Sequence, residues 1–282
     1  MRLVAALPAN RRAYLGLTAP AVLLMAALFL APLAQVLWLS ISEPRLGLEN
    51  YAELAHNPLI WRIWWTTLEV CLVTTFVSVS LGYVVAAAMA QVEERHRTIM
   101  IFCIVLTFSL SILVRGFAFV VLLRSEGVLN GMLLALGLVH RPLYLLRNEL
   151  GVLVGMVHYG LPVAILPIYS SMRGIGDQYV RAARSLGASA SQTFRLVYFP
   201  LTLPGVISAS ALVFIYSLGF FIIPALLGGG HVVMIAEYIR VGFEETLRWG
   251  YASMLATTLL AAVAVVLVAM SRVIDLRKMF GG

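Results

Sequence analysis

Two ionisable residues that could do chemistry in this chain lie inside long apolar runs. Glu69 and Arg115 both fall within segments long enough to cross a membrane. A charged group in hydrocarbon is costly, so each is expected to face a bundle interior, a partner group or a water-filled path. Two structural alternatives stay open: the two side chains could pair with each other, or either could reach water at the membrane surface.

A second group of residues could attract and hold a cation. Glu237, Glu244 and Glu245 follow a break in an apolar run, and Tyr216 and Phe220 precede that break. Carboxylates near a mouth attract a cation, and aromatic faces bind it through cation–π contacts. Solvated loop charges are the alternative interpretation of the glutamates. The candidate substrate path is therefore Glu69, Arg115, Tyr216, Phe220, Glu237 and Glu245.

Motifs of catalysis and metal binding are absent from the sequence. A P-loop requires Gly-Lys followed by Ser or Thr, whereas the single lysine, Lys278, is followed by Met279. The five histidines are scattered without metal-ligand spacing, and no Gly-x-Ser-x-Gly elbow occurs. Cys71 and Cys103 both lie in predicted helices, so we expect no disulfide. The sequence predicts a protein that is not an enzyme and has no metal or cofactor of its own.

The elements that must position these residues are membrane helices. Of 282 residues, 61% are hydrophobic and 12% charged, and the mean hydropathy is +0.95, which excludes a soluble globular domain. Each crossing needs about 20 apolar residues. About six such spans, helical because backbone groups must be satisfied within each segment, are predicted in one domain covering 1–282: Tyr14–Leu39, Thr66–Ala90, Ile99–Leu123, Leu150–Met172, Leu203–Ile223 and Gly250–Ser271.

The fifth span is expected to break at its outer end. Gly219, Pro224 and the glycines at 228–230 interrupt its helical pattern. Irregular backbone at membrane depth is tolerated only where it is buried in protein or lines a watery cavity. The break is therefore expected beside the candidate path.

The net charge of +7 is best explained by topology and not by nucleic-acid binding. With both termini in the cytoplasm, twelve of the 20 Lys and Arg residues lie on the inner side, as the positive-inside rule favours. These are Arg2, Arg11, Arg12, Arg95, Arg97, Arg173, Arg181, Arg184, Arg195, Arg272, Arg277 and Lys278.

A polar island from Tyr179 to Gly205 separates two apolar spans. Its small residues recur at helical intervals and leave a shallow face for a close partner. Gly187 can end a first short helix with a positive φ, and Ser189 or Ser191 can cap a second helix, which carries Phe194. We predict a bent helix pair across the membrane surface; an interfacial loop without a partner is the alternative. The residues expected to contact a partner are Ala182, Ala183, Gly187, Ala188, Phe194 and Pro200.

This island resembles the "EAA" cytoplasmic loop of membrane subunits of binding-protein-dependent ABC importers, in which the loop docks the ATPase. The strings IPALLGG, HVVMIAEYI and FEETLRWGYAS are similar to the spermidine/putrescine branch of that family. The resemblance implies a type I importer permease fold with a cytoplasmic coupling helix at about 173–202. One departure is Arg181, which stands where family members usually carry Glu, so contacts of that Glu do not carry over.

The resemblance also implies partners and a location. These are two copies of a cytoplasmic ATPase that holds ATP and Mg, a second permease chain that is expected to be a paralogue, and a periplasmic substrate-binding protein. The expected location is the bacterial inner membrane, and the expected solute is a polyamine. Alternatives are another solute of the same transporter class, namely iron, sulfate, a phosphonate or an opine-like amino acid derivative, or else a secondary carrier or channel. A membrane-embedded enzyme is the weakest alternative.

Overall fold

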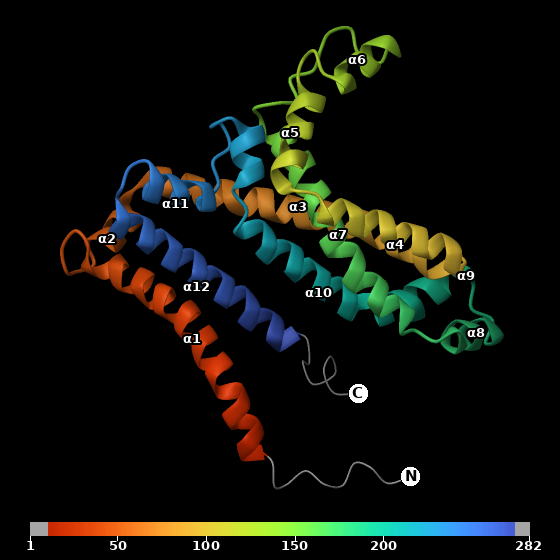
Figure 1. The fold of residues 1–282 in the computed structure, drawn as a ribbon. Helices are drawn as coiled ribbons and strands as arrows, with labels where there is room; N and C mark the ends of the chain where they lie inside the picture. The colour runs from red at the N-terminus through yellow and green to blue at the C-terminus, as the bar shows by residue number, and fades with distance from the viewer. Residues whose placement is uncertain (1–10, 274–282) are drawn as a thin grey trace.

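The computed structural model describes residues 11–273, and every regular element in that range is a helix (Figure 1). Both chain termini, with Arg2, Arg277 and Lys278, lie outside the described residues. Five helical stretches are long and apolar enough to cross a membrane, and a sixth crossing requires a bent helix pair. The five are formed by α1 (Arg11–Ser42), α3 (Pro58–Gln91), α7 (Glu149–Arg173), the stretch Ala190–Leu218 that ends with α10 (Phe199–Leu218), and α12 (Trp249–Val273).

Local capping sets where two of these helices begin. The Asn57 side chain accepts a hydrogen bond from Leu59 N at 3.0 Å, and Pro58 occupies the first helical position of α3. The helix therefore begins eight residues before the predicted span, and Trp61, Trp64 and Trp65 lie in its first turns. Asn148 caps α7 in the same way, through Gly151 N at 2.9 Å.

The centre of the molecule is the packing of α3, α7 and α10 (Figure 1). Glycines allow the close approach: a Cβ on Gly205 of α10 would meet Pro167 O of α7 at 3.2 Å and collide with the Ser171 side chain. Two apolar clusters fill the space between the helices, one around Met156 and Ile223 and the other around Ile168 and Ala209. These three helices form the packed core of the molecule.

The predicted span Ile99–Leu123 is wrong as a single helix. It forms α4 (Glu94–Ser109) and α5 (Ile112–Leu123), and the α5–α6 segment is bent from α4 by 95°. Thr107 and Ser109 donate their hydroxyl hydrogens to backbone oxygens one turn earlier, at 2.8 Å. Hydroxyl side chains of this kind compete with the helix ladder, and Leu110 and Ser111 have extended ψ angles. After α5 comes the short α6 (Val128–Ala135), which projects from the body (Figure 1).

The predicted break after the fifth span is confirmed. α10 ends at Leu218 instead of Ile223, and the chain passes through a π-helical turn η2 (Pro224–Gly228) into left-handed residues Gly229 and Gly230. Phe220, Ile223 and Leu227 are buried against α3 and α7. Protein therefore covers this irregular backbone, which meets the condition for such a segment at membrane depth.

A second layer consists of α1, α12, α2 (Glu49–His56) and α11 (Ile235–Glu244). α1 and α12 run side by side, away from α3 and α7 (Figure 1). The buried Asn50 donates hydrogen bonds to Ser40 O and Glu43 O, and Arg248 pairs with Glu53 at 2.8 Å. These contacts fix α2 between the end of α1 and the beginning of α12.

Candidate functional site

Three of the predicted path residues meet in one aromatic cluster. The Arg115 guanidinium lies 4.0 Å from the ring centre of Tyr159, and that ring lies 5.2 Å from Phe220. Tyr216 continues the series, with its ring centre 5.3 Å from that of Phe220. The cluster joins α5, α7 and the end of α10, beside the break in the fifth span.

Arg115 is buried, at 9% exposed, without an acidic partner among the described residues. Its Nε and Nη1 atoms lack hydrogen-bond acceptors there. The guanidinium instead lies on the Tyr159 ring in a cation–π contact, and such contacts contribute about 2 kcal/mol or more when desolvated. Tyr159 is itself fixed, because its hydroxyl donates to Ile112 O at 2.7 Å.

Glu69 lies apart from Arg115 and forms no ion pair with it. It is exposed on α3, in a stripe at helical spacing with Trp65, Leu72 and Phe76, which are 71%, 59% and 74% exposed. A carboxylate within an apolar face of a spanning helix needs water or a protein partner opposite it. This face of the isolated chain is therefore incomplete.

The two other candidate carboxylates lie on or beside α11 and differ in environment. Glu237 is 8% exposed, and its Oε2 has no partner among the described residues. Burial raises the pKa of this carboxyl to about 7, although Arg240 partly lowers it. Glu245 is exposed and pairs with Arg240 at 3.0 Å, and Glu244 pairs with the same guanidinium at 2.7 Å. The pairing by Arg240 leaves Glu237 as the unpaired carboxylate of this group.

One tertiary hydrogen bond joins the two helices that carry Glu69 and Glu237. Ile235 N donates to Thr67 Oγ1 at 2.9 Å, and Thr67 is buried whereas Glu69 lies on an exposed face of the same helix. The start of α11 is thereby fixed to the N-terminal part of α3.

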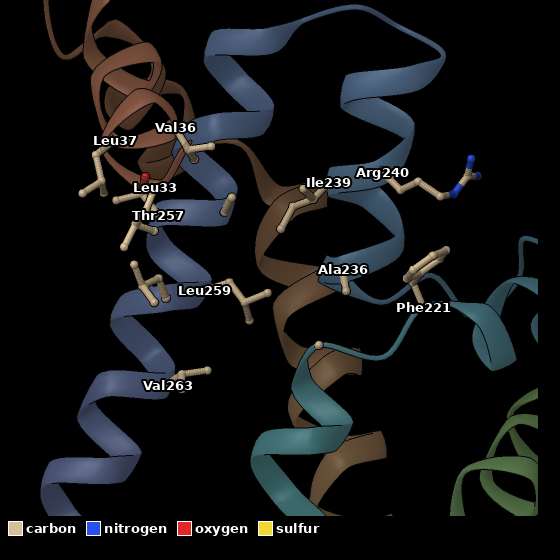
Figure 2. A pocket seen from close by; sticks show the side chains of 13 residues that line it. Leu33, Val36, Leu37, Phe221, Ala236, Ile239, Arg240, Thr257, Leu259 and Val263 are labelled. Carbon is tan, nitrogen blue, oxygen red and sulfur yellow. The ribbon is translucent and has the colours of Figure 1, made fainter. Parts of the chain in front are cut away.

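The cavity of Figure 2 is a poor site for a cation. It measures about 520 Å³ and lies between α1, α11, α12 and the break after α10. Its lining is almost wholly apolar, and the Arg240 side chain extends away from it (Figure 2). A polar solute would lose hydration there without gaining hydrogen bonds.

The polar island folds as a helical hairpin. α8 (Asp177–Ser185) ends before Gly187, which has the predicted positive φ of +85°. Ser189 then forms a capping box with Gln192 and begins α9 (Ala190–Thr193). The predicted second helix with its cap at Ser189 is confirmed, and it continues without interruption through the π-helical turn η1 (Phe194–Tyr198) into α10, so the hairpin is joined to a spanning helix.

The hairpin presents small residues and isolated apolar side chains on its surface. Ala182, Gly187 and Pro200 are exposed, and Leu186 is 89% exposed. Ala183 and Ala188 are half-buried. Phe194 is 44% exposed and keeps one edge against Tyr83 of α3, with ring centres 6.4 Å apart. A partner that covers this surface would bury apolar area and contact the start of α10 directly.

Sequence reasoning missed two residues of the aromatic cluster, Tyr159 and His158. His158 lies 5.0 Å from Phe119 and 5.9 Å from Tyr159, measured between ring centres. The signal available was the presence of an ionisable imidazole in the middle of an apolar span. His158 has no metal-ligand spacing to another histidine, so a motif of that kind could not identify it.

Comparison with known proteins matches residues 78–279 to the family described as "Binding-protein-dependent transport system inner membrane component". The spermidine/putrescine transport system permease protein PotB of Haemophilus influenzae is 33% identical over 220 residues, which cover 78% of this chain and 77% of that protein. PotB of Escherichia coli K12 is 32% identical over 212 residues, covering 75% and 77%. The molybdenum transport system permease protein ModB of Azotobacter vinelandii is 29% identical over 163 residues, covering 58% and 70%.

Solved structures share the fold at low sequence identity. A chain of the bacterial alginate ABC transporter, crystallised with its alginate pentasaccharide-bound periplasmic protein, has a TM-score of 0.76 at 16% identity, covering 93% of this chain and 94% of that one. A chain of the MetNI methionine ABC transporter in an inward-facing conformation has a TM-score of 0.56, also at 16% identity, covering 77% and 96%. The arrangement of helices is therefore that of ABC importer permeases.

Proposed function

Because this chain belongs to the family of binding-protein-dependent transport system inner membrane components, we propose that it forms the translocation path of an ABC importer for a polyamine. It is a multi-pass inner-membrane protein and not itself catalytic. The observation that carries the substrate assignment is the identity of 32–33% to proteins named as spermidine/putrescine permeases.

The electrostatics of the described residues support a cationic solute. Glu69 and Glu237 are carboxylates without ion-pair partners among the described residues. The ring of Tyr216 is 39% exposed near the break after α10 and can offer its face to an ammonium group, with the buried Phe220 ring packed beside it. The positive charge of Arg115 would repel a cationic solute. Its guanidinium is buried, however, and lies on the ring of Tyr159.

ATP hydrolysis is assigned to two copies of a separate cytoplasmic ATPase, which would hold ATP and Mg. The hairpin around Gly187 is the proposed docking element, with Ala182, Ala183, Ala188, Phe194 and Pro200. Its direct continuation into α10 supports this role, since movement of the hairpin must move a helix that ends beside the aromatic cluster. With the ATPase docked on this side, the proposed topology has both termini in the cytoplasm.

A second permease chain, proposed to be a paralogue, would complete the path. α4 buries none of its residues, and the stripe around Glu69 on α3 is exposed. A face that combines apolar side chains with one carboxylate suits a protein partner better than lipid alone. A periplasmic binding protein would deliver the solute to the outer segments.

Uptake into proteoliposomes tests the assignment. The chain, its second permease and its ATPase are reconstituted, and radiolabelled spermidine and putrescine are supplied with the binding protein. ATP-dependent accumulation of either polyamine is expected, without accumulation of iron, sulfate, a phosphonate or an opine. Uptake of one of those solutes instead would refute the substrate but retain the importer. Uptake that needs no ATPase subunit would favour the secondary carrier.

A further inference from the structure

A basic pocket lies between the hairpin and the ends of three neighbouring helices. It measures about 560 Å³ and is lined from the end of α3, the start of α4, the end of α7, and α8, α9 and η1. Four of its lining residues are arginines, and none is acidic. The arginines are Arg97, Arg173, Arg181 and Arg184, which come from three different helices.

None of the four guanidinium groups forms an ion pair with a described residue. Arg97 is held in place by its own backbone contacts, because Nη2 donates to Val92 O at 2.9 Å and Nε donates to Met89 O at 3.2 Å. Arg181 and Arg184 are exposed. These positive charges come from separate helices and face one concavity without an acidic partner among the described side chains, and such a concavity attracts an anion.

Two buried hydroxyl groups in the same pocket lack partners. Thr193 is 4% exposed and Tyr169 is 8% exposed, and neither the Thr193 Oγ1 nor the Tyr169 hydroxyl has a hydrogen-bond partner in the described part of the chain. A buried unpaired polar group is costly, so these hydroxyls provide donors that an oxyanion could accept. The pocket therefore offers both charge and directed hydrogen bonds.

We propose that this pocket binds the phosphate of an anionic phospholipid headgroup. Arginine guanidinium groups match phosphate oxygens in pairs, and basic pockets between spanning helices on the cytoplasmic side bind such headgroups. The location fits a lipid, because α3 and α7 are spanning helices that end here. Ala87, Ala90 and Met172 give the pocket an apolar floor beside its charges, which suits a headgroup attached to acyl chains.

The bound lipid would hold α8 to the ends of the spanning helices. Val180, Arg181 and Arg184 face the pocket, whereas Ala182, Leu186 and Gly187 do not line it. On α8 the proposed lipid site and the proposed ATPase-docking surface thus use different residues, whereas Phe194 of η1 borders both. Bilayer charge would set the position of the hairpin, whatever solute is carried.

The test is a lipid titration of the full-length permease in a neutral detergent. Thermal unfolding is followed as dioctanoylphosphatidylglycerol is added, with dioctanoylphosphatidylcholine and inorganic phosphate as parallel additions. Phosphatidylglycerol alone is expected to stabilise the protein. The double variant Arg181→Gln/Arg184→Gln should raise the half-saturating lipid concentration roughly thirtyfold, since each basic residue near an anionic lipid contributes about a fivefold effect.

Two further variants separate a built site from general surface charge. Arg95→Gln/Arg195→Gln removes two exposed arginines that do not line the pocket, and its titration should match the wild type. Thr193→Val removes no charge, yet it should weaken the lipid effect by removing a buried donor. Equal losses in the two double variants, with Thr193→Val unchanged, would overturn the proposal in favour of diffuse attraction.

Other outcomes would also overturn it. Equal stabilisation by inorganic phosphate would assign the pocket to a free anion. An unchanged lipid titration with lost ATPase copurification in Arg181→Gln/Arg184→Gln would assign it to an acidic segment of the ATPase.

Discussion

At the scale of single residues, environment separates the two path glutamates. Glu69 is exposed within an apolar stripe, whereas Glu237 is buried and has an unpaired carboxylate oxygen. The sequence placed both among apolar residues but did not distinguish these surroundings. Each leads to a separate prediction.

Glu69→Gln is expected to reduce polyamine uptake about tenfold, which corresponds to about 1.4 kcal/mol of lost attraction for the cation. Assembly should persist, because this side chain forms no ion pair with a described residue. The measurement is initial uptake rate in proteoliposomes, with Glu126→Gln, an exposed glutamate on another segment, as the control. Equal uptake by wild type and Glu69→Gln would contradict a role of Glu69 in attracting the solute and would indicate a structural role instead.

Glu237 should make stability depend on pH. Its pKa of about 7 in the folded protein lies above the reference value of 4.5, so its contribution is fully present below about pH 4.5 and is lost as pH rises through 7. Glu237→Gln should therefore stabilise the protein at pH 8, by up to about 3 kcal/mol, with little effect at pH 4.5. Thermal unfolding at both pH values checks this, and a pH-independent effect would contradict it. The control Glu126→Gln should show no such difference.

At the scale of elements, Gly187 fixes the geometry of the hairpin. A Cβ there would contact nothing within 4 Å, so the obstacle to substitution is the φ of +85° together with loss of the shallow surface. Gly187→Leu should reduce the amount of ATPase that copurifies with the permease about tenfold. A left-handed conformation costs a non-glycine residue about 1–2 kcal/mol, and the added side chain blocks docking. Asn tolerates this conformation, so Gly187→Asn should assemble better than Gly187→Leu. Normal copurification and uptake with Gly187→Leu would contradict the docking role.

The contact between α7 and α10 depends on Gly205. Gly205→Ala should lower stability by about 1–3 kcal/mol, because the new methyl group would collide with Ser171 across the helix interface. Gly131→Ala on α6 is the matched control, since its Cβ meets nothing within 4 Å. That control should gain about 0.4–1 kcal/mol from reduced freedom of the unfolded chain. Thermal unfolding of both variants in detergent makes the comparison, and equal melting temperatures would refute close packing at Gly205.

At the scale of the whole molecule, α7 separates two surfaces that are expected on opposite sides of the membrane. The segment after α6 precedes α7, and the hairpin follows it (Figure 1). In a background with Cys103→Ser, Leu186→Cys should react with a membrane-impermeant maleimide only from the cytoplasmic side. Leu138→Cys should react only from the other side; both leucines are well exposed. Labelling of Leu186→Cys from outside would overturn the proposed orientation.

The order of residues was enough to predict a bundle of membrane helices with a break after the fifth span and a helical turn at Gly187. Those features depend on local chemistry: apolar length, hydroxyl caps, and the freedom of glycine at positive φ. The bend between α4 and α5 was not predicted, because an apolar run that contains Ser and Thr is compatible with either a straight or a broken helix. The continuation of the hairpin into α10 was not predicted, because Pro200 can mark the end of one helix or occupy the first turn of the next.

Which side chains from distant parts of the chain lie in contact depends on helix packing. It put the Arg115 guanidinium on Tyr159, left Glu69 on an exposed face, paired Glu245 with Arg240, and collected four arginines around one pocket. Hydropathy reports how much of a helix is apolar but not which neighbour each face touches. Helix packing sets those contacts, and here it depends on small residues that bring α3, α7 and α10 together.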